Sequence, residues 1–521
     1  MHAAAPPGCD RGAYNCGDTH ARNDMQQLSG QDASFIYLDS TQGRTHVGML
    51  GIYDQSTAPS AKVRFKDIIG HVESRLGTAG VFRQKLVRVP MDLDNPWWVD
   101  DEDFDIEFHV RHIALPRPGD WRQFCILVAR LHSRPLDMAR PLWEMNVIEG
   151  LNNIPWLPKS SFAIYTKMHH AAVDGHTGTE ITAGMHDTSP EPAPRPPRTR
   201  WRPEPGPGQA GILVRAGLNN VITPVRMARH VFGAAPGLAK TVLKRFTGGE
   251  GDERMRVPRT RFNGKITQHR VVDGTRFSLE EVSRVRVAVA GSTVNDVVLS
   301  IAGGALRRYL EAKDELPGDS LVAFAPINVR RENERNTGGN QVSLMRAALR
   351  TDIADPVERL AAVHRGTSRS KEITNAIGAR ELTDLNKYTP PATLALAGRL
   401  ITRAALLSRT PLVNCVVTNV PGAQVPLYLN GARLLSMGGL GPIVNGMGLI
   451  IVVVSYNGEL TMTLTSDREM VPDPAFFTEC INESWSALKS AAAKAAGPAK
   501  KSAPRKKKSS RPAASGGRRR A

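Results

Sequence analysis

The stretch SFAIYTKMHHAAVDGHTG, residues 161–178, decides the fold and the chemistry of this chain. Its first half alternates apolar and other residues with the period of two that is typical of a β-strand, and it ends on His169 and His170. Asp174 and Gly175 follow after three small apolar residues, and a glycine permits the tight turn that would bring Asp174 back beneath the histidines. The stretch therefore predicts a strand that delivers two histidines to its end.

A histidine at a strand end is suited to proton transfer. The strand is a rigid mount, and an unperturbed imidazole pKa of about 6.5 lets the ring accept and return a proton near neutral pH. His169 and His170 should point to opposite faces of the strand, and the sequence offers no fixed third His or Cys ligand, which argues against a metal site. A purely structural histidine pair stays open from these residues alone.

Composition predicts a folded chain of more than one domain. The chain has 521 residues, of which 41% are hydrophobic and 23% charged, the balance of a globular protein with a large core. The net charge is +18, but twelve Lys or Arg and no acid follow from Lys489 onward, so the residues before it carry 18 − 12 = +6. A basic tail of this kind attracts any polyanion, whether nucleic acid or an anionic membrane.

The cysteines and the apolar runs indicate a reducing compartment and no membrane span. Five cysteines without a C-x-x-C pair argue against a disulfide framework and against a Cys-rich zinc site. Residues 1–24 contain no apolar run and cannot act as a signal peptide. Residues 434–458 carry no charge, but their glycines and Pro442 would break a helix, so we expect a Gly-rich loop followed by a buried strand at 449–456.

The order of helix-like, strand-like and Pro-rich segments along the chain predicts a mixed α/β protein with two lobes. Helices are expected at 121–132, 278–289 and 294–310, the last capped by Ser292 and Thr293, and further strands at 321–324 and 413–419. The predicted units are a disordered head at 1–24, an N-terminal lobe at 25–187, a Pro-rich linker and amphipathic helical connector at 188–258, a C-terminal lobe at 259–491 and a disordered basic tail at 492–521. The basic, apolar connector segment 212–246 either lies against the lobes or forms an interfacial helix on a membrane.

The motif HHAAVDG, residues 169–175, resembles the H-H-x-x-x-D-G motif of the bacterial wax ester synthase/diacylglycerol acyltransferase family. The broader superfamily of CoA-dependent acyltransferases and nonribosomal-peptide condensation domains shares this motif. Four further segments resemble the family in order and spacing: LSGQDASF at 28–35, RPLWE at 140–144, TVNDVVLS at 293–300 and NVPG at 419–422. The likeness covers about residues 25–488 and departs from the family at Gly30-Gln31, where Ser or Pro followed by Thr is expected.

The resemblance implies two chloramphenicol-acetyltransferase-like α/β lobes joined by a long helical linker, with an active-site tunnel between them. It makes His170 the general base and His169 a support on the other face of the strand, while Asp174 and Gly175 orient the turn. Asn295 and Asp296 would bring the second lobe near the site, and residues 141–143 would pack the first lobe. It implies no metal and no cofactor, because acyl-CoA is a co-substrate.

The implied activity is transfer of a long-chain fatty acyl group from acyl-CoA to diacylglycerol or to a long-chain alcohol. A G-x-S-x-G elbow is absent, and Cys125 and Cys415 stand in apolar surroundings, which argues against a covalent acyl-enzyme. We expect a cytoplasmic protein held at the inner face of the cell membrane or at lipid bodies by its basic tail. Two alternatives stay open: a condensation-type acyltransferase that uses a carrier-protein thioester, and a nucleic-acid-binding protein built around the tail, although the tail lacks aromatics for base stacking.

Overall fold

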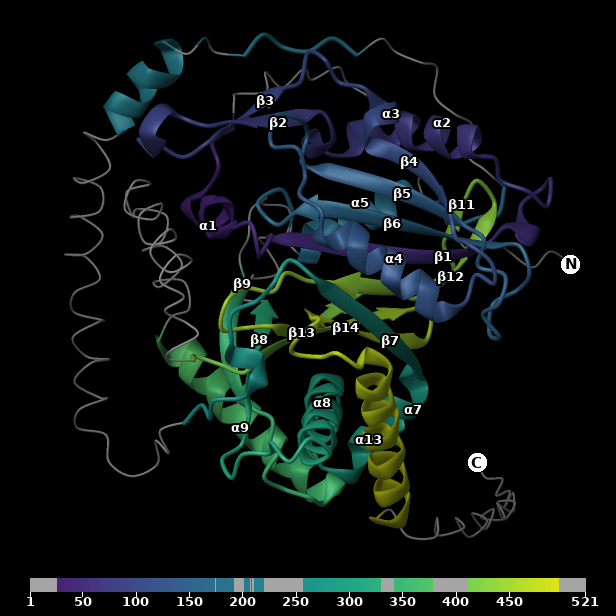
Figure 1. Cartoon of the computed structure of the whole chain (residues 1–521), viewed down its shortest axis with the longest axis vertical. Coiled ribbons are helices and arrows are strands. Elements are labelled where there is room, and N and C mark those ends of the chain that lie inside the picture. The colour runs from purple at the N-terminus through teal and green to yellow at the C-terminus, as the bar shows by residue number, and fades with distance from the viewer. Residues whose placement is uncertain are drawn as a thin grey trace, which may run out of the picture.

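The computed structural model describes residues 26–173, 175–191, 201–206, 208, 210–219, 256–328, 342–377 and 411–495. These residues form two lobes, each built on a six-stranded sheet, with one lobe above the other in Figure 1. The mixed α/β fold class and the two-lobed architecture are as the sequence predicted. The predicted head, most of the linker and connector, and nearly all of the basic tail lie outside the described residues.

The N-terminal lobe has the strand order β11-β12-β1-β6-β5-β4, in which only β4 and β5 are paired in parallel. The elements contributed by this half of the chain are β1 (His46–Asp54), β4 (Val110–Ala114), β5 (Trp143–Glu149), β6 (Ser161–His169), the ribbon of β2 (Gln84–Val87) and β3 (Trp97–Asp100), and the helices α1 (Gly30–Leu38), α2 (Phe65–Arg75), α3 (Ile106–His109), α4 (Trp121–Ser133) and α5 (Gly175–Met185). Helix α4 begins where the sequence predicted, because Asp120 and Gln123 form a capping box. Its apolar face packs Phe124 and Val128 onto the sheet.

The C-terminal lobe has the strand order β7-β14-β13-β10-β8-β9, with β10 parallel to both of its neighbours. Its elements are β7 (Arg270–Ser278), β8 (Val322–Asn328), β9 (Val342–Ala348), β10 (Cys415–Pro421), β13 (Leu449–Tyr456), β14 (Glu459–Asp467), α7 (Leu279–Val285), α8 (Val294–Glu311), α9 (Pro356–Ile377) and α13 (Pro474–Ala495). Helix α8 starts at a Thr293 cap, as predicted, and packs between α9 and α13 (Figure 1). The strands predicted at 321–324, 413–419 and 449–456 are also confirmed.

Two strands cross from the second half of the chain into the first lobe. β11 (Tyr428–Leu429) and β12 (Ala432–Leu440) complete the N-terminal sheet, and β12 pairs antiparallel with β1. The Gly-rich loop that the sequence predicted from residue 434 is therefore wrong up to Leu440. The physical reason is close packing: a Cβ on Gly439 would lie 2.5 Å from Val452 Cγ1 of the other sheet, so glycine is needed there inside a strand.

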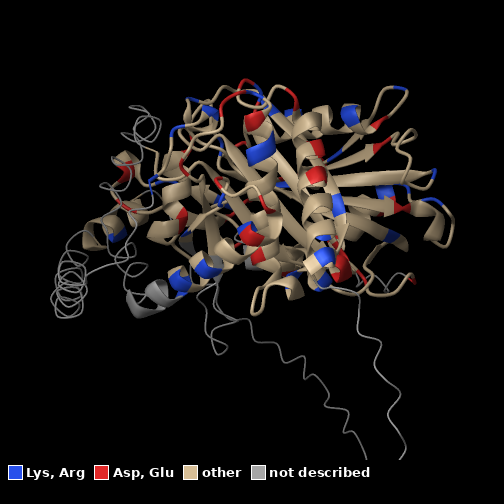
Figure 2. Ribbon diagram, turned by 90° about the horizontal axis from the view of Figure 1, so that it is seen from below, with Lys and Arg blue, Asp and Glu red and all other residues tan. Residues whose placement is uncertain are grey.

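Direct contacts also tie the two lobes together. Trp121 Nε1 in α4 donates to Asp273 Oδ1 in β7 at 2.7 Å. Within the first lobe, His132 Nε2 of α4 lies 3.1 Å from the carbonyl oxygen of Gly441, the residue after β12. On the face seen in Figure 2, acidic and basic residues are intermixed, as expected for a body of small net charge. None of the helices in the described ranges is long and apolar enough to cross a membrane.

Candidate active site

The two histidines lie at the end of a central strand. His169 is the last residue of β6, and His170 begins the turn that leads to α5. The His169 backbone N–H donates to the Leu142 carbonyl at 3.0 Å, and the His170 N–H donates to the Thr45 carbonyl at 2.8 Å. Because the residues just before β1 and β5 hold consecutive residues from both sides, the backbone under the histidines is fixed.

His169 is buried, and its ring has one clear tautomer. The Ala171 N–H donates to His169 Nδ1 at 3.1 Å, so the ring proton belongs on Nε2. Nε2 lies 3.2 Å from Thr45 Oγ1 and 3.5 Å from Asp39 Oδ2. The Thr45 N–H and hydroxyl both bond to Asp39 Oδ1 at 2.7 Å. Asp39, Thr45 and His169 therefore form one buried cluster, which we call the Asp39 cluster.

The Asp39 cluster keeps its carboxylate charged. Burial alone would raise the pKa of Asp39, but its hydrogen bonds with His169 and Thr45 outweigh this and lower that pKa below its ordinary value. His46 lies opposite His169 in the β1–β6 register, with its ring edge-on to the His169 ring at 5.7 Å. Burial lowers the pKa of His46 well below the ordinary value, so this neighbour is a neutral ring at physiological pH.

His170 differs from its neighbour because its side chain is only half-buried. Its ring stacks on Phe35 of α1, with the ring centroids 3.9 Å apart and the planes 12° from parallel. The stack fixes the plane of the imidazole and covers one face of it. The other side of the imidazole is left partly exposed.

The other predicted site residues make no contact with the histidine pair that the described residues show. Asp174 lies outside the described residues, and Gly175 is the first residue of α5. Asn295 is half-buried in the first turn of α8, whereas Asp296 is buried and accepts hydrogen bonds from Thr367 Oγ1 at 2.6 Å and from the Thr293 N–H at 2.8 Å.

Asp296 also lies 3.0 Å from His364 Nδ1, so it joins the start of α8 to α9. Burial would raise the pKa of Asp296, but its hydrogen bonds with Thr367, Thr293 and His364 outweigh this and lower the pKa. All of these contacts lie within the C-terminal lobe. They describe a positioning role for Asp296 inside that lobe and no contact with the histidine pair.

The RPLWE segment supports the strand that carries the histidines. Trp143 is buried and donates from Nε1 to the Phe82 carbonyl at 2.9 Å. Leu142 supplies the carbonyl that holds the His169 backbone. This segment therefore packs the first lobe, as the sequence predicted for residues 141–143.

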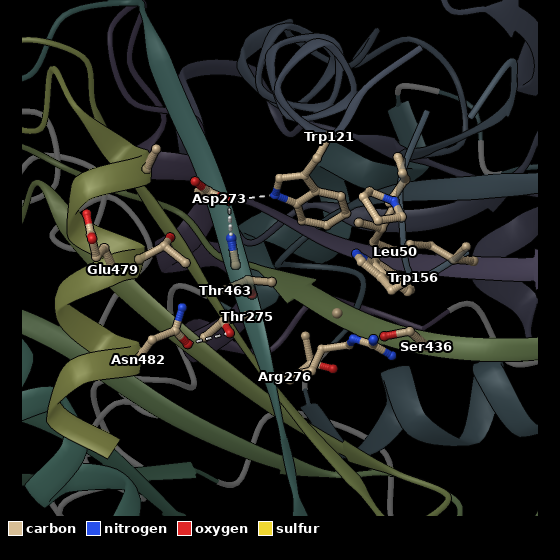
Figure 3. Close-up of a pocket in the computed structure, with 18 residues that line it drawn as sticks. Leu50, Trp121, Trp156, Asp273, Thr275, Arg276, Ser436, Thr463, Glu479 and Asn482 are labelled. Atoms are coloured by element: carbon tan, nitrogen blue, oxygen red, sulfur yellow. Dashed lines mark hydrogen bonds between the residues drawn. The ribbon is translucent and has the colours of Figure 1, made fainter. Parts of the chain in front are cut away.

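A cavity of about 530 Å³ lies between the lobes (Figure 3). The side chains of Trp121, Trp156 and Leu50 line one side, and Asp273 and Asn482 line the other. Among the described residues that line it, neither histidine of the pair appears. Roughly 16 Å of β1 separates Leu50 from the strand end beside His170. The cavity is thus separate from the histidine pair.

The three cysteines within the described ranges are poor nucleophiles. Cys125, Cys415 and Cys480 are buried and free. Burial raises the pKa of Cys125 well above the ordinary value, that of Cys415 to about 12 and that of Cys480 to about 11. These thiols stay protonated at neutral pH, and a protonated thiol does not attack a thioester. Within the described ranges, no three His, Cys, Asp or Glu side chains are grouped to hold a metal ion.

Two family profiles match successive parts of the chain, and the first runs past the N-terminal lobe into the start of α8. The wax ester synthase/diacylglycerol acyltransferase catalytic domain matches residues 28–298, and the WS/DGAT C-terminal domain matches residues 338–489. The chain belongs to the wax ester synthase/diacylglycerol acyltransferase family. Among curated WS/DGAT relatives, a Mycobacterium tuberculosis protein named as a putative diacylglycerol O-acyltransferase is 34% identical over 454 residues, 86% of this chain and 87% of that protein. Another from the same species, named as a probable diacylglycerol O-acyltransferase, is 32% identical over 86% of this chain and 95% of that protein.

Solved structures agree with the WS/DGAT assignment. The wax ester synthase/diacylglycerol acyltransferase from Marinobacter aquaeolei VT8 is 28% identical, with a TM-score of 0.63 over 90% of this chain and 100% of that one. The first condensation domain of the calcium-dependent antibiotic synthetase has a TM-score of 0.54 at 13% identity, over 91% and 98% of the two chains. That second likeness shows a shared fold alone.

Sequence reasoning missed four residues around the WS/DGAT histidine pair: Phe35, Asp39, Thr45 and His46. Phe35 ends the LSGQDASF segment, which served only as a mark of the family, and its contact with His170 needed the fold to be seen. The signal for the others was their position just before and at the start of β1, the strand that pairs with β6.

Proposed function

We propose that this WS/DGAT protein transfers a long-chain fatty acyl group from acyl-CoA to diacylglycerol, which yields triacylglycerol, and to long-chain alcohols, which yields wax esters. The observation that carries the proposal is the contrast between the two histidines. His170 is half-exposed and stacked on Phe35 at the end of a rigid strand, whereas His169 is buried in the Asp39 cluster. The names of the mycobacterial relatives support diacylglycerol as an acceptor.

In the proposed reaction His170 acts as general base and then as general acid. It takes the proton of the acceptor hydroxyl while that oxygen attacks the thioester carbonyl carbon. The tetrahedral oxyanion collapses, the C–S bond breaks, and the protonated imidazole returns its proton to the CoA thiolate. The ester and free CoA leave, and no covalent acyl-enzyme is needed. The raised pKa values of the buried cysteines support this direct route.

The remaining site residues act through His170 in this proposal. His169 and the Asp39 cluster hold the end of β6, because the Thr45 carbonyl binds the His170 N–H. Asp174 and Gly175 orient the turn that leads into α5. Asn295 and Asp296 position the start of α8, so that the C-terminal lobe faces the site. We further propose that the protein acts at the inner face of the cell membrane or at lipid bodies, since both lipid substrates reside there, and that the basic tail adds electrostatic attraction to anionic lipid.

The test replaces each histidine in turn. His170→Ala should lower kcat by about 10²–10⁴, the usual contribution of a general base, with little change in melting temperature. His169→Ala should cost less in rate and more in stability, because its buried ring is bonded to Ala171 and Thr45. Asp174→Asn should be intermediate. His269→Ala, an exposed histidine before β7, is the matched control.

The assay measures CoA release from palmitoyl-CoA and separates products by thin-layer chromatography, with diacylglycerol and hexadecanol offered in parallel. If His169→Ala is the slower enzyme while still folded, the base has been assigned to the wrong histidine. If His170→Ala matches the control, the proposed mechanism is wrong. If neither product forms with the wild type, the proposed substrates are wrong.

A further inference from the structure

Exposed apolar side chains gather in one place. Ten large hydrophobic side chains are exposed in the described part of the chain, and five of them belong to two short segments. Met91 and Leu93 lie in the loop between β2 and β3, and Leu213, Val214 and Leu218 lie in the helix of residues 210–219. We call these five residues the apolar tip. Because half of the exposed large hydrophobic side chains lie in these two short segments, they form a concentrated apolar surface and are not scattered singly.

The two segments are packed together. Ile212 and Ala216 of the helix are buried against Val89 and Trp97, which flank the loop. Asn219 Nδ2 donates to Asp94 Oδ2 in the loop at 2.8 Å. Figure 1 shows this helix beside the β2–β3 ribbon at the upper left.

The helix of residues 210–219 therefore has two faces. Ile212 and Ala216 are four residues apart and face inward. Val214 and Leu218 follow each of them by two positions, which places them on the opposite, outward face. Their exposed fractions are 65% and 58%.

Met91 projects from a strained turn. Its backbone lies in the left-handed region, with φ 57° and ψ 17°, and its side chain is 83% exposed. A long side chain rarely adopts this conformation, in which Gly or Asn is favoured. The fold therefore holds an apolar side chain out into water at a backbone cost, which is typical of a position with a function.

In the two described segments that form the apolar tip, the acidic side chains are buried and the basic ones are exposed. Asp92 is buried and bonded to Arg88 Nη2 at 2.7 Å, and Asp94 is buried beneath Asn219. Arg88 keeps about half of its side chain exposed, and the exposed Arg215 lies over the Trp97 ring at 5.6 Å. The tip thus presents apolar groups flanked by guanidinium groups, the pattern that complements phospholipid.

The ribbon behind the apolar tip also contacts the candidate active site. Leu86 and Trp98, at the β2–β3 pair, share a core cluster with Tyr37 of α1 and Ala171 of the histidine turn. Helix α1 also carries Phe35, the ring stacked on His170. A surface that docks through the apolar tip would therefore lie next to the elements that position the proposed base.

We propose that the apolar tip inserts into a phospholipid surface, with Arg88 and Arg215 at the level of the phosphates. The proposal rests on the proposed function, because that surface would contain the lipid acceptor. It assigns lipid docking to the folded N-terminal lobe in addition to the basic tail. Docking there brings α1 and the histidine turn close to the phase in which the acceptor is dissolved.

The experiment measures binding of the full chain to vesicles of phosphatidylcholine and phosphatidylglycerol by co-sedimentation, in 0.5 M salt to screen the tail. The triple variant Met91→Ser/Val214→Ser/Leu218→Ser should weaken binding by at least about tenfold, because the buried apolar area is lost. Val287→Ser is the matched control, since Val287 is 74% exposed in the other lobe. The control should bind as the wild type does.

Two results would overturn the docking proposal. One is equal binding by the triple variant and the wild type. The other is a wild type that forms dimers in light scattering while the triple variant is monomeric, which would make a second copy of the chain the occupant. A separate assay tests the proposed function: it measures turnover of octanoyl-CoA with a water-soluble alcohol, which needs no lipid surface. Lack of that turnover in the wild type counts against the function alone, since vesicle binding needs no catalysis.

Discussion

At the scale of single residues, a carboxylate next to the histidine pair decides how the pair is held. Asp39 accepts two bonds from Thr45, and the Thr45 carbonyl in turn binds the His170 backbone. The proton on His169 Nε2 lies on the side of Thr45 and Asp39. Asp39 is therefore a positioning residue: it touches no substrate in the proposed reaction but fixes both histidines.

Asp39→Asn should lower kcat by roughly 10- to 100-fold with a smaller change in KM, because a small misplacement of a base is costly. The amide would turn a donor toward Thr45 or toward the His169 Nε2 proton. Restoration of part of the rate by Asp39→Glu, measured in the CoA-release assay, would show that the carboxylate is what matters. A kcat for Asp39→Asn equal to that of the surface variant Asp352→Asn would contradict the positioning role.

The same variant has a predicted pH signature. The pKa of Asp39 is lowered in the folded state, so its stabilising contribution is present above the unfolded pKa of about 3.9 and is lost as pH falls through the lower folded value. Chemical denaturation at pH 7 should show Asp39→Asn to be less stable by about 1–3 kcal/mol. The difference from the wild type should shrink at pH values below about 4.

The sequence could predict the histidine pair but not the residues around it. The alternation from Phe162 to Met168 and the two histidines at its end are local signals, and the strand formed as expected. That His46 faces His169 depends on the register between β1 and β6, strands more than a hundred residues apart. Likewise, the stack of Phe35 on His170 depends on how α1 docks. Local periodicity carries no information on either.

At the scale of elements, β12 shows how composition can mislead. Several glycines in an uncharged stretch predicted a loop, because glycine is conformationally free. In the fold, Gly438 and Gly439 lie in a strand where the two sheets approach each other, and the Thr463 hydroxyl donates to the Gly439 carbonyl. β11 and β12 come from the second half of the chain and join the first sheet. No local sequence pattern predicts this pairing.

Gly439→Val should therefore destabilise the protein strongly. A Cβ there would lie 2.5 Å from Val452 Cγ1 and 3.2 Å from Val454 Cγ2, both in β13. Overpacking of this kind typically costs about 1–3 kcal/mol or more, measured here as the free energy of unfolding in urea. Gly318→Val is the control, since a Cβ at Gly318 meets nothing within 4 Å. Equal stability of the two variants would mean that β12 does not pack tightly on the second sheet.

At the scale of the whole molecule, the lobes share strands and buried polar bonds, so we expect them to unfold together. Within the first lobe, His132 joins the two halves of the chain: its Nε2 lies 3.1 Å from the carbonyl of Gly441, which directly follows β12. That carbonyl can only accept, so Nε2 carries the proton. The Tyr165 hydroxyl, 2.7 Å away, then donates to Nδ1. Both ring nitrogens are engaged by a neutral imidazole, and a second ring proton would break the bond from Tyr165.

This arrangement predicts acid destabilisation well above the range in which carboxylates titrate. Burial lowers the pKa of His132 to about 3. Between pH 6.5 and pH 3, His132 is therefore protonated in the unfolded chain but stays neutral in the folded protein. The free energy of unfolding should therefore fall by about 1.6 kcal/mol from this residue alone between pH 6.5 and pH 5. In His132→Phe the lost hydrogen bonds lower the starting stability, but the dependence on pH over that interval should flatten by the same amount. Urea titrations at several pH values measure the slope independently of the baseline, and an unchanged slope in the variant would mean that His132 is not the group that resists protonation.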